Sequence, residues 1–336
     1  MSRRVAFAAA HVVADLDGGI DWEATLAFRH HLWGHGLGVA EAMDTAQRGM
    51  GLDWPAAQEL IRRTAAEAGG RLAAGAGTDH TRPRTLDDVR AAYEHQCEVV
   101  EGTGAQAIVM ASRALAAIAR SPDDYREVYG AVLSQLDRPA ILHWLGDMFD
   151  PALGGYWNPT HPTDLDEAAD TLLAIIAEHA DKVDGVKVSL LDADREVAIR
   201  SRLPAGVRLY TGDDFNYPEL IAGGSDALLG VFDAIAPAAA ATLAALEAGD
   251  RAEYDRILEP TVPLARRLFE PPTFNYKTGI VFLAWLNGHQ DHFVMLDGLE
   301  TARSPEHLAD VYALADRAGL LRDPELAADR MRLALA

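Results

Sequence analysis

The sequence predicts an α/β fold, a (β/α)8 barrel with a C-terminal helical extension. Short apolar runs alternate eight times with longer amphipathic runs, which is the pattern of parallel strands joined by helices. No G-x-G-x-x-G motif follows the first strand, which argues against a doubly wound dinucleotide-binding sheet. The chain has 336 residues, and one TIM barrel of this kind takes roughly 250. The remainder leaves room for additional helices.

Each expected strand is a short apolar run next to glycine, proline or polar residues, which favour turns. In chain order, strands are expected at residues 5–9, 39–43, 71–75, 107–111, 140–144, 185–189, 207–210 and 227–231. Helices between them are expected at residues 22–35, 54–68, 85–102, 122–136, 164–179, 191–200, 215–222 and 234–247. A serine, a proline and two aspartates at 121–124 are typical of a first helical turn. Glycine pairs at 69–70 and 223–224 are typical of helix ends.

The pattern becomes entirely helical after about residue 248. Further helices are expected at residues 250–269, 277–286, 304–318 and 323–335. We therefore predict a barrel domain at residues 1–248 and a helical extension at residues 249–336 that packs on the barrel.

The composition limits the classes of partner. Asp and Glu number 51 against 30 Lys and Arg, a formal net charge of −21. Nucleic acid and anionic membranes both require basic patches, so we expect neither as a partner. No apolar run reaches the roughly 18 residues that a membrane-spanning helix needs. The single cysteine, Cys97, cannot form an intramolecular disulfide, and a cytoplasmic location is expected.

Lys187 is the first candidate for chemistry, because it lies near the end of the sixth expected strand. Catalytic groups of such barrels lie at the carboxyl ends of strands and in the loops that follow. Burial in an apolar strand lowers the pKa of a lysine, and the free amine can attack a carbonyl to form an imine. The alternative is a side chain that points outward and reaches solvent along its aliphatic stem.

The fifth and seventh strands also end in polar residues. Asp213 and Asp214 can fix a substrate hydroxyl, although one of them can instead cap the next helix. His143 is a candidate acid–base group near neutral pH. Trp144 and Asp147 follow it as candidate substrate-binding residues. The long loop at residues 145–163 suits a lid or a substrate wall, or a surface loop with aromatic residues packed underneath.

Further candidates follow the second and third strands. Thr45 can relay a proton, Asp44 can contact the substrate, and Arg48 can hold a carboxylate or another anionic group. His80 is a candidate substrate-binding residue after the third strand. In the extension, Lys277 is a rival amine that ranks below Lys187, because it lies outside the barrel strands.

Two segments carry a resemblance to a known family. The run Asp184-Gly-Val-Lys187 is similar to a G-[IV]-K strand, and Thr211-Gly-Asp-Asp214 is similar to an S-G-D-[DE] turn with a Gly-Gly pair downstream. Over about residues 5–300, the chain resembles the dihydrodipicolinate synthase and N-acetylneuraminate lyase superfamily of class I, Schiff-base aldolases. More narrowly, it is similar to a dihydrodipicolinate-synthase-like branch of unknown function. The resemblance implies that Lys187 forms the imine and that the protein is a homo-oligomer, a dimer or a tetramer.

The chain departs from that family where the family binds pyruvate. The family's G-T-T-G-E loop holds the carboxylate of a 2-keto acid, and here residues 44–48 read D-T-A-Q-R, which keeps only Thr45. The family's catalytic tyrosine at the end of strand five falls on His143, and the second tyrosine of the relay has no match in residues 110–113. The resemblance therefore implies imine chemistry without the family's usual recognition of pyruvate.

The leading hypothesis is a lyase or aldolase in which Lys187 forms an imine with a small carbonyl compound, a keto acid or a keto-sugar-like substrate. His143 and Thr45 would move protons, and no cofactor is needed beyond the covalent imine. Two alternatives remain open. A metal-dependent barrel enzyme would hold a divalent ion with histidine and carboxylate ligands at the strand ends, although no H-x-H or H-E-x-x-H motif occurs there. The third hypothesis is a non-catalytic binding protein on an aldolase scaffold.

Overall fold

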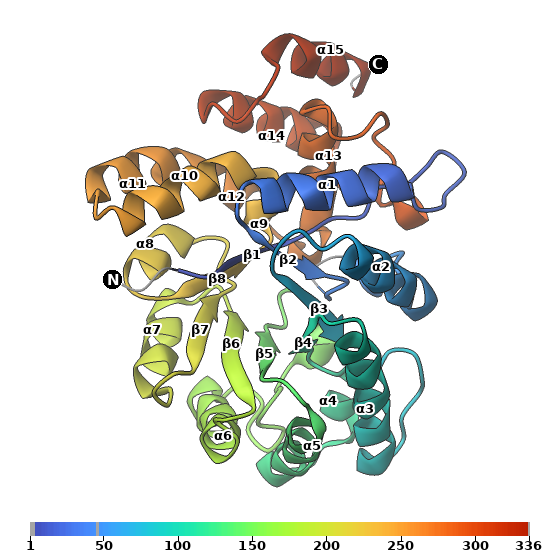
Figure 1. Ribbon diagram of the computed structural model, residues 1–336, viewed down its shortest axis with the longest axis vertical. Coiled ribbons are helices and arrows are strands. Elements are labelled where there is room, and N and C mark those ends of the chain that lie inside the picture. Colours follow the sequence, from blue (N-terminus) through green and yellow to red (C-terminus); the bar gives the residue numbers. More distant parts are fainter. Residues whose placement is uncertain (1–3, 45–46, 335–336) are drawn as a thin grey trace.

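Eight parallel strands form one closed barrel in the order of the chain, which confirms the predicted fold (Figure 1). The computed structural model describes residues 4–44 and 47–334. The strands are β1 (Ala6–Ala9), β2 (Gly38–Glu41), β3 (Leu72–Ala76), β4 (Gln106–Val109), β5 (Ala140–Leu145), β6 (Val183–Ser189), β7 (Arg208–Thr211) and β8 (Asp226–Leu229). β1 pairs with β8 and closes the barrel.

Helices follow the strands around the outside of the barrel. They are α1 (Trp22–Gly34), α2 (Trp54–Ala66), α3 (Leu86–Gly102), α4 (Arg113–Ile118), α5 (Pro122–Gln135), α6 (Leu165–Glu178), α7 (Ala193–Arg202), α8 (Tyr217–Ala222), α9 (Val231–Ala234) and α10 (Ala236–Glu247). Polar side chains fix many of the helix starts by accepting hydrogen bonds from first-turn N–H groups, as Asp53 does from Ala56 and Thr85 from Asp88. The short helix α4 was not expected from the sequence, and it begins where the Ser112 hydroxyl accepts from the Leu115 N–H.

Alternate residues along the strands face opposite sides of the barrel wall. Phe7, Ile141 and Tyr210 belong to a cluster inside the barrel, whereas Trp144 and Val188 belong to the larger cluster between strands and helices. Side chains two residues apart on one strand therefore point to the same side. This alternation determines which polar residues reach the barrel axis.

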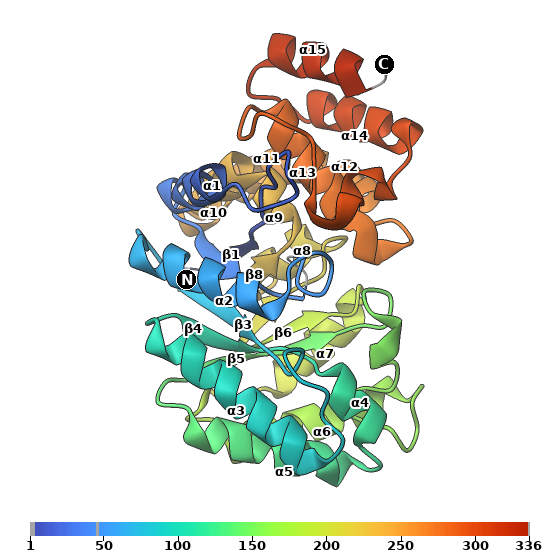
Figure 2. The ribbon, with the colours of Figure 1, turned by 90° about the vertical axis from the view of Figure 1, so that its right-hand side faces the viewer.

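Only helices follow β8 in the described part of the chain. They are α11 (Arg251–Leu258), α12 (Val262–Leu268), α13 (Tyr276–Leu286), α14 (Pro305–Arg317) and α15 (Pro324–Ala334), with short 3-10 turns between some of them. All 11 residues of α13 are buried, and this helix packs against α9, α12, α14 and α15. Figures 1 and 2 show α14 and α15 stacked beyond α1, at the end of the molecule farthest from α5 and α6.

A buried ion pair joins α1 to β2. Arg29 and Glu41 are both 0% exposed, and two hydrogen bonds of 2.9 and 2.8 Å join the guanidinium to the two carboxylate oxygens. Thr64 of α2 donates to the same carboxylate at 2.8 Å, and Arg29 also donates to the His11 carbonyl oxygen. One charged group thus connects the first two helices to the second strand.

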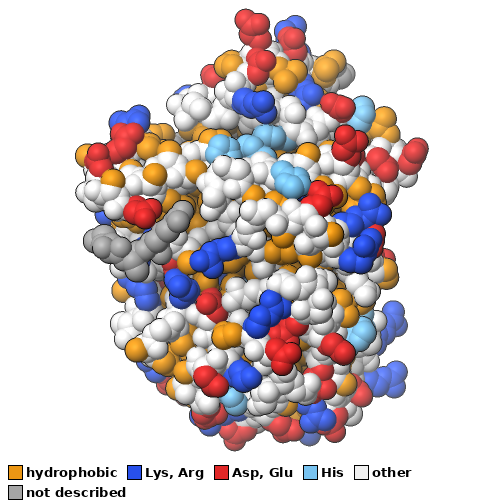
Figure 3. Space-filling view, in the orientation of Figure 1, with side chains coloured by type: hydrophobic (Ala, Val, Ile, Leu, Met, Phe, Trp, Pro, Cys, Tyr) orange, Lys and Arg blue, Asp and Glu red, His pale blue; other side chains and the backbone are white. Residues whose placement is uncertain are grey.

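Charged side chains of both signs are interspersed over the face of the molecule in Figure 3, and histidines gather there between α1 and the C-terminal helices. None of the helices in residues 4–44 and 47–334 is both long enough and apolar enough to cross a membrane.

Candidate active site

Lys187 lies inside the barrel, near the carboxyl end of β6, and is only 2% exposed. Its register neighbours are His143 in β5 and Tyr210 in β7, and Tyr210 belongs to the cluster inside the barrel. Burial lowers the pKa of Lys187 to about 8, although the charges of Asp44 and Asp214 act in the opposite direction. A larger fraction of this amine is therefore unprotonated near neutral pH than for an exposed lysine.

His143 joins Asp44 and Ser189 in a chain of hydrogen bonds beside the lysine. Its Nδ1 lies 3.1 Å from a carboxylate oxygen of Asp44, and its Nε2 lies 3.1 Å from the Ser189 hydroxyl. Burial lowers the pKa of His143, so the ring is neutral at pH 7. A carboxylate only accepts, so Nδ1 carries the proton and Nε2 accepts from the Ser189 hydroxyl. This arrangement can move a proton between a hydroxyl and an imidazole whose tautomer is fixed.

Gly212 has no side chain, and this absence lets Lys187 and Ser189 lie against the backbone at the end of β7. A Cβ added there would lie 2.2 Å from the Ser189 Oγ, 2.8 Å from the Lys187 Cε and 2.8 Å from the Val188 carbonyl oxygen. Any side chain at this position would displace the amine or the β6 backbone. The glycine of the Thr211-Gly-Asp-Asp214 run is thus explained by close contact with the lysine.

The two aspartates that follow Gly212 have different surroundings. Asp213 accepts from the N–H groups of Phe215 and Asn216, at 2.8 and 3.0 Å, just before α8 begins. It therefore stabilises the turn before α8 and does not cap the helix itself, whose N-cap residue is Asn216. Asp214 is 3% exposed and accepts from the Val231 N–H at 2.7 Å. Burial raises the pKa of Asp214, and the charge of Lys187 opposes that rise.

The extension brings a second buried lysine to the same end of the barrel. The Lys277 ammonium donates to the Ala9 carbonyl oxygen at the end of β1 and lies 3.3 Å from a carboxylate oxygen of Asp233. Asp233 also accepts from the N–H and the Nδ1 of His11, at 2.6 and 2.9 Å. Burial lowers the pKa of Lys277, and its charge in turn lowers the pKa of Lys187. The two amines are thus close enough to interact.

The Arg48 guanidinium is hydrogen-bonded to acceptors within the protein. Its guanidinium makes five hydrogen bonds, to both carboxylate oxygens of Asp79, to the carbonyl oxygens of Ala42 and Gly75, and to the side chain of Gln96. These bonds engage all five N–H donors of the side chain. His80 lies on the outside of the same group, where its Nδ1 is bonded to Gln96.

Two other predicted residues are not brought to Lys187. Trp144 lies on the opposite face of β5 from His143 and packs between strands and helices. Asp147 is exposed at the start of the following loop. Thr45 lies outside the described residues. The sequence analysis did not identify Ser189. The signal was its position two residues after Lys187 in an expected strand, because residues two apart on a strand face the same side.

The loop at 145–163 buries its aromatic rings against tyrosines of α3 and α5. Tyr156 and Trp157 are 2% and 0% exposed. The Tyr156 hydroxyl lies 2.9 Å from that of Tyr129 and accepts from the Ser112 N–H at 3.0 Å. The aromatic residues therefore pack underneath the loop, as the second interpretation of this segment expected.

Two cavities meet at Asp44. One, of 330 Å³, is also lined by Thr78, Ser112 and Arg113 after the ends of β3 and β4. The other is small and lies beside Tyr276 and Lys277. Asp44 lines both and is hydrogen-bonded to His143, so the larger cavity leads from the surface toward His143.

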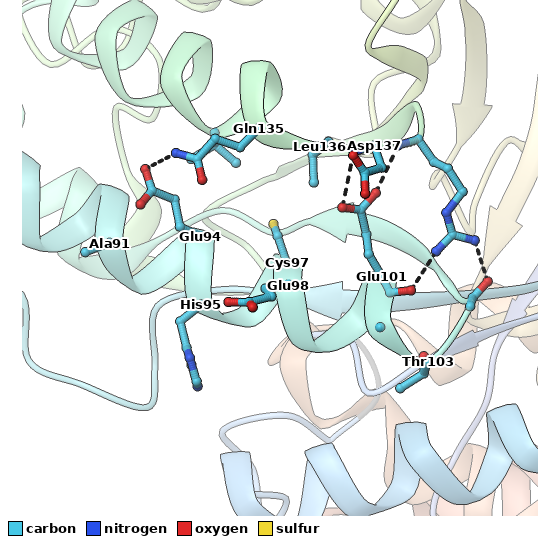
Figure 4. Close-up of a pocket in the computed structure, with 14 residues that line it drawn as sticks. Ala91, Glu94, His95, Cys97, Glu98, Glu101, Thr103, Gln135, Leu136 and Asp137 are labelled. Atoms are coloured by element: carbon cyan, nitrogen blue, oxygen red, sulfur yellow. Dashed lines mark hydrogen bonds between the residues drawn. The ribbon is translucent and has the colours of Figure 1, made fainter.

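A larger cavity of 920 Å³ lies outside the barrel, between α3 and α5 (Figure 4). Its polar side chains are bonded to one another: Gln135 donates to Glu94, and the Arg138 N–H donates to Glu101 at 3.0 Å. Burial raises the pKa of the Cys97 thiol on its wall to about 12, so this group is not a nucleophile at neutral pH. This cavity offers no comparable reactive group, so the group around Lys187 is the candidate active site.

Within residues 4–44 and 47–334, no three His, Cys, Asp or Glu side chains are grouped so that they could hold a metal ion. The histidine and carboxylate candidates of the metal hypothesis are dispersed: His161 is bonded to Glu167 at the surface, and His143 is bonded to Asp44 and Ser189.

Similar solved structures are dihydrodipicolinate synthases. The enzyme from Aquifex aeolicus has a TM-score of 0.73 at 18% identity, with 95% of this chain and 99% of that chain covered. The chloride-inhibited enzyme from Acinetobacter baumannii, complexed with pyruvate, has a TM-score of 0.72 at 17% identity, with 95% and 100% covered. A prophage protein of the dihydrodipicolinic acid synthase family from E. coli K12, in complex with pyruvate, has a TM-score of 0.75 at 14% identity, with 94% and 99% covered.

These similarities confirm that the fold is that of the dihydrodipicolinate synthase superfamily, as the sequence motifs implied. No curated protein matches the chain. One family matches its whole length, residues 1–336. The chain therefore belongs to the family described as Protein of unknown function (DUF993).

Proposed function

We propose that this protein is a Schiff-base-forming lyase or aldolase, with the amine of Lys187 as its nucleophile. The observation that carries the proposal is a lysine 2% exposed inside the barrel, at the catalytic end, with a pKa lowered by burial. A buried lysine is costly in a strand that serves only for packing, and the lowered pKa favours its use as a nucleophile.

In the proposed reaction, the Lys187 nitrogen attacks the carbonyl carbon of the substrate and forms a C–N bond. The carbonyl oxygen takes up protons and leaves as water, which gives a protonated imine. In the cleavage step, a substrate hydroxyl gives its proton to His143 and the carbon that bears it leaves as a separate carbonyl compound. The electron pair of the broken carbon–carbon bond moves toward the iminium nitrogen and forms an enamine. Return of a proton and hydrolysis release the product and restore the amine.

The proton steps are assigned to the hydrogen-bonded group of Asp44, His143 and Ser189. Its neutral imidazole can accept a proton at Nε2 and pass it back, while Asp44 stabilises the charged ring. This group occupies the place of the tyrosine that the family resemblance expects at the end of strand five. Thr45 stays a predicted participant.

The proposed substrate is a small keto compound with several hydroxyl groups. Pyruvate is bound by two of the similar proteins, but here Arg48 has its five donors engaged by the protein. A carboxylate of a keto acid would therefore need another partner. The negative charges of Asp44 and Asp214 both act on Lys187, since each raises its pKa. Their carboxylate oxygens are acceptors suited to substrate hydroxyl groups.

The test is reduction of the imine with borohydride, followed by peptide mass spectrometry. The chain has three lysines, Lys182, Lys187 and Lys277, so the position of a reduced adduct can be assigned without ambiguity. Pyruvate and a panel of keto sugars and their acids serve as carbonyl compounds. We expect an adduct on Lys187 with at least one of them.

The matched variants are Lys187→Arg, which should abolish the adduct, and Lys182→Arg, which should leave it unchanged. Lys182 lies five positions before Lys187 and donates to the Leu136 carbonyl oxygen at 2.7 Å, away from the barrel axis. An adduct on Lys277, or none with any compound of the panel, would refute the assignment.

A further inference from the structure

A cavity of 680 Å³ lies between the barrel and the extension, apart from the site of Lys187. Its walls come from α1, α9, α10, α11 and α13 and from residues 317–322, which include the end of α14 and the loop before α15. Histidines gather on this part of the surface, between α1 and the C-terminal helices (Figure 3). The volume is within the range of roughly 300–1,000 Å³ that small-molecule sites occupy.

Polar groups on the wall lack hydrogen-bond partners among the described residues. Neither ring nitrogen of His31 or of His289 bonds to another side chain or to the backbone, although the two rings lie 4.4 Å apart. The Asn287 side chain accepts from the Arg322 N–H through its oxygen, which leaves its amide N–H groups without a bond in the described chain. Three side chains with N–H donors thus line one cavity and are available to a ligand.

The charge of the wall is opposite to that of the chain. Arg317 and Arg322 are exposed at its rim, and neither forms an ion pair with any residue that the structure describes. The carboxylate on the wall is Asp233, which is already hydrogen-bonded to His11 and paired with the Lys277 ammonium. In a protein of net charge −21, this is a local positive site.

Apolar residues form the rest of the lining. Phe28 of α1, Ile257 of α11 and Leu320 face the cavity together with two prolines, Pro237 and Pro260. A fully hydrated inorganic ion would leave this surface without a partner, whereas a ligand with an apolar body would cover it. Both features together define the ligand class.

We propose that this cavity binds a small organic anion, a carboxylate or phosphate monoester with an apolar body of medium length. The anionic group would lie at Asn287, His289 and Arg322, and the apolar body would contact Phe28 and Ile257. The proposal concerns a second site and is independent of the chemistry assigned to Lys187.

Isothermal titration calorimetry on the full chain tests it with four probes: octanoate, octyl phosphate, octanol and octylamine. We expect saturable binding of one molecule of octanoate or octyl phosphate per chain, at least about tenfold tighter than octanol or octylamine, because a charged group adds that much through one good hydrogen bond. On addition of the same anion, the NMR chemical shifts of the His31 and His289 ring protons should change and follow the saturation curve measured by calorimetry.

The variants Arg322→Ala and His289→Leu should each weaken binding of the anion about tenfold. Two matched controls should leave it unchanged. Arg120→Ala removes another exposed arginine whose N–H is bonded to a side chain, and His292→Leu removes an exposed histidine three residues after His289. Equal binding of octylamine and octanoate, no saturation by either anion, or equal losses in variants and controls would each overturn the proposal. Circular dichroism checks that all four variants are folded.

Discussion

Lysine is rare in this chain, and most of its lysines are buried. Of 30 basic residues, three are lysines, and two of those, Lys187 and Lys277, are buried at the same end of the barrel. A guanidinium stays charged, whereas burial brings the pKa of an ammonium group toward neutrality. Lys277 is bonded to a carboxylate and a carbonyl oxygen, which favours the charged form. These bonds argue against Lys277 as the nucleophile of the proposed reaction and favour a positioning role for it.

The rate of imine trapping should therefore depend on pH. A protonated amine is not a nucleophile, so the rate of borohydride-trapped adduct formation should rise with pH and level off above about 8, where the pKa of Lys187 lies. Asp214→Asn removes a negative charge that raises this pKa, so the midpoint should move to lower pH. The measurement is the initial rate of adduct formation between pH 6 and about 10, near the ordinary lysine pKa.

Asp147→Asn provides the comparison for that experiment. It removes the same charge from an exposed position beyond β5, and its pH profile should match that of the wild type. A wild-type midpoint near 10.4, the value of an ordinary lysine, would contradict the burial argument.

Gly212 provides a separate prediction about space. In Gly212→Ala the new methyl group would meet the Ser189 Oγ and the Lys187 Cε, so imine trapping should fall more than about tenfold, and overpacking should cost roughly 1–3 kcal/mol of stability. The control is Gly34→Ala, where an added Cβ meets no atom within 4 Å. Equal trapping rates in the two variants would show that the close contact has no role in positioning the amine.

At the level of single residues, strand alternation would have predicted more of the candidate site than residue type did. Lys187 could be found from the sequence because the end of an apolar strand made a charged residue conspicuous. Ser189 follows from the same alternation, while Trp144 fails it, because it is one residue after His143 and points away from the axis. Lys277 could not be placed, since no local pattern shows that a helix of the extension reaches β1.

At the scale of elements, a buried ion pair joins the first helix, α1, to strand β2. Arg29, Glu41 and Thr64 form one buried group shared by α1, β2 and α2. Glu41→Gln would leave the Arg29 guanidinium buried without its counter-charge, and such losses cost about 3–5 kcal/mol. We expect this decrease in the free energy of unfolding, measured by urea denaturation.

Glu67→Gln is the matched change at the surface, where Glu67 is bonded to His30 and both side chains are about half exposed. Exposed pairs contribute roughly 0–1 kcal/mol, so its unfolding curve should nearly coincide with that of the wild type. If both variants lost the same free energy of unfolding, burial of the Arg29–Glu41 pair would not increase its contribution to stability.

Most elements could be predicted because periodicity and capping residues act locally. Asp53 and Thr85 stand where helices begin, and each accepts a first-turn N–H. The six-residue helix α4 was missed because so short a segment has no recognisable amphipathic period. The expected helix at 234–247 is divided into α9 and α10, with Ile235 between them.

For the whole molecule, the number and alternation of elements identified the barrel, because only parallel strands separated by helices fit the pattern. The cavity between barrel and extension could not be predicted in this way. It is made by α1 at one end of the chain and by residues 317–322 at the other, and long-range contacts of this kind leave no trace in local periodicity.

The bond from Lys277 to the Ala9 carbonyl oxygen joins residues 268 positions apart, which has a consequence for synthesis on the ribosome. All eight strands of the barrel are translated before Lys277 is made. Until this residue has left the exit tunnel, Asp233 and the end of β1 lack their cation. A nascent barrel that closes before then would lack this cation, so we expect the proposed reactivity of Lys187 to appear only after the extension has been made.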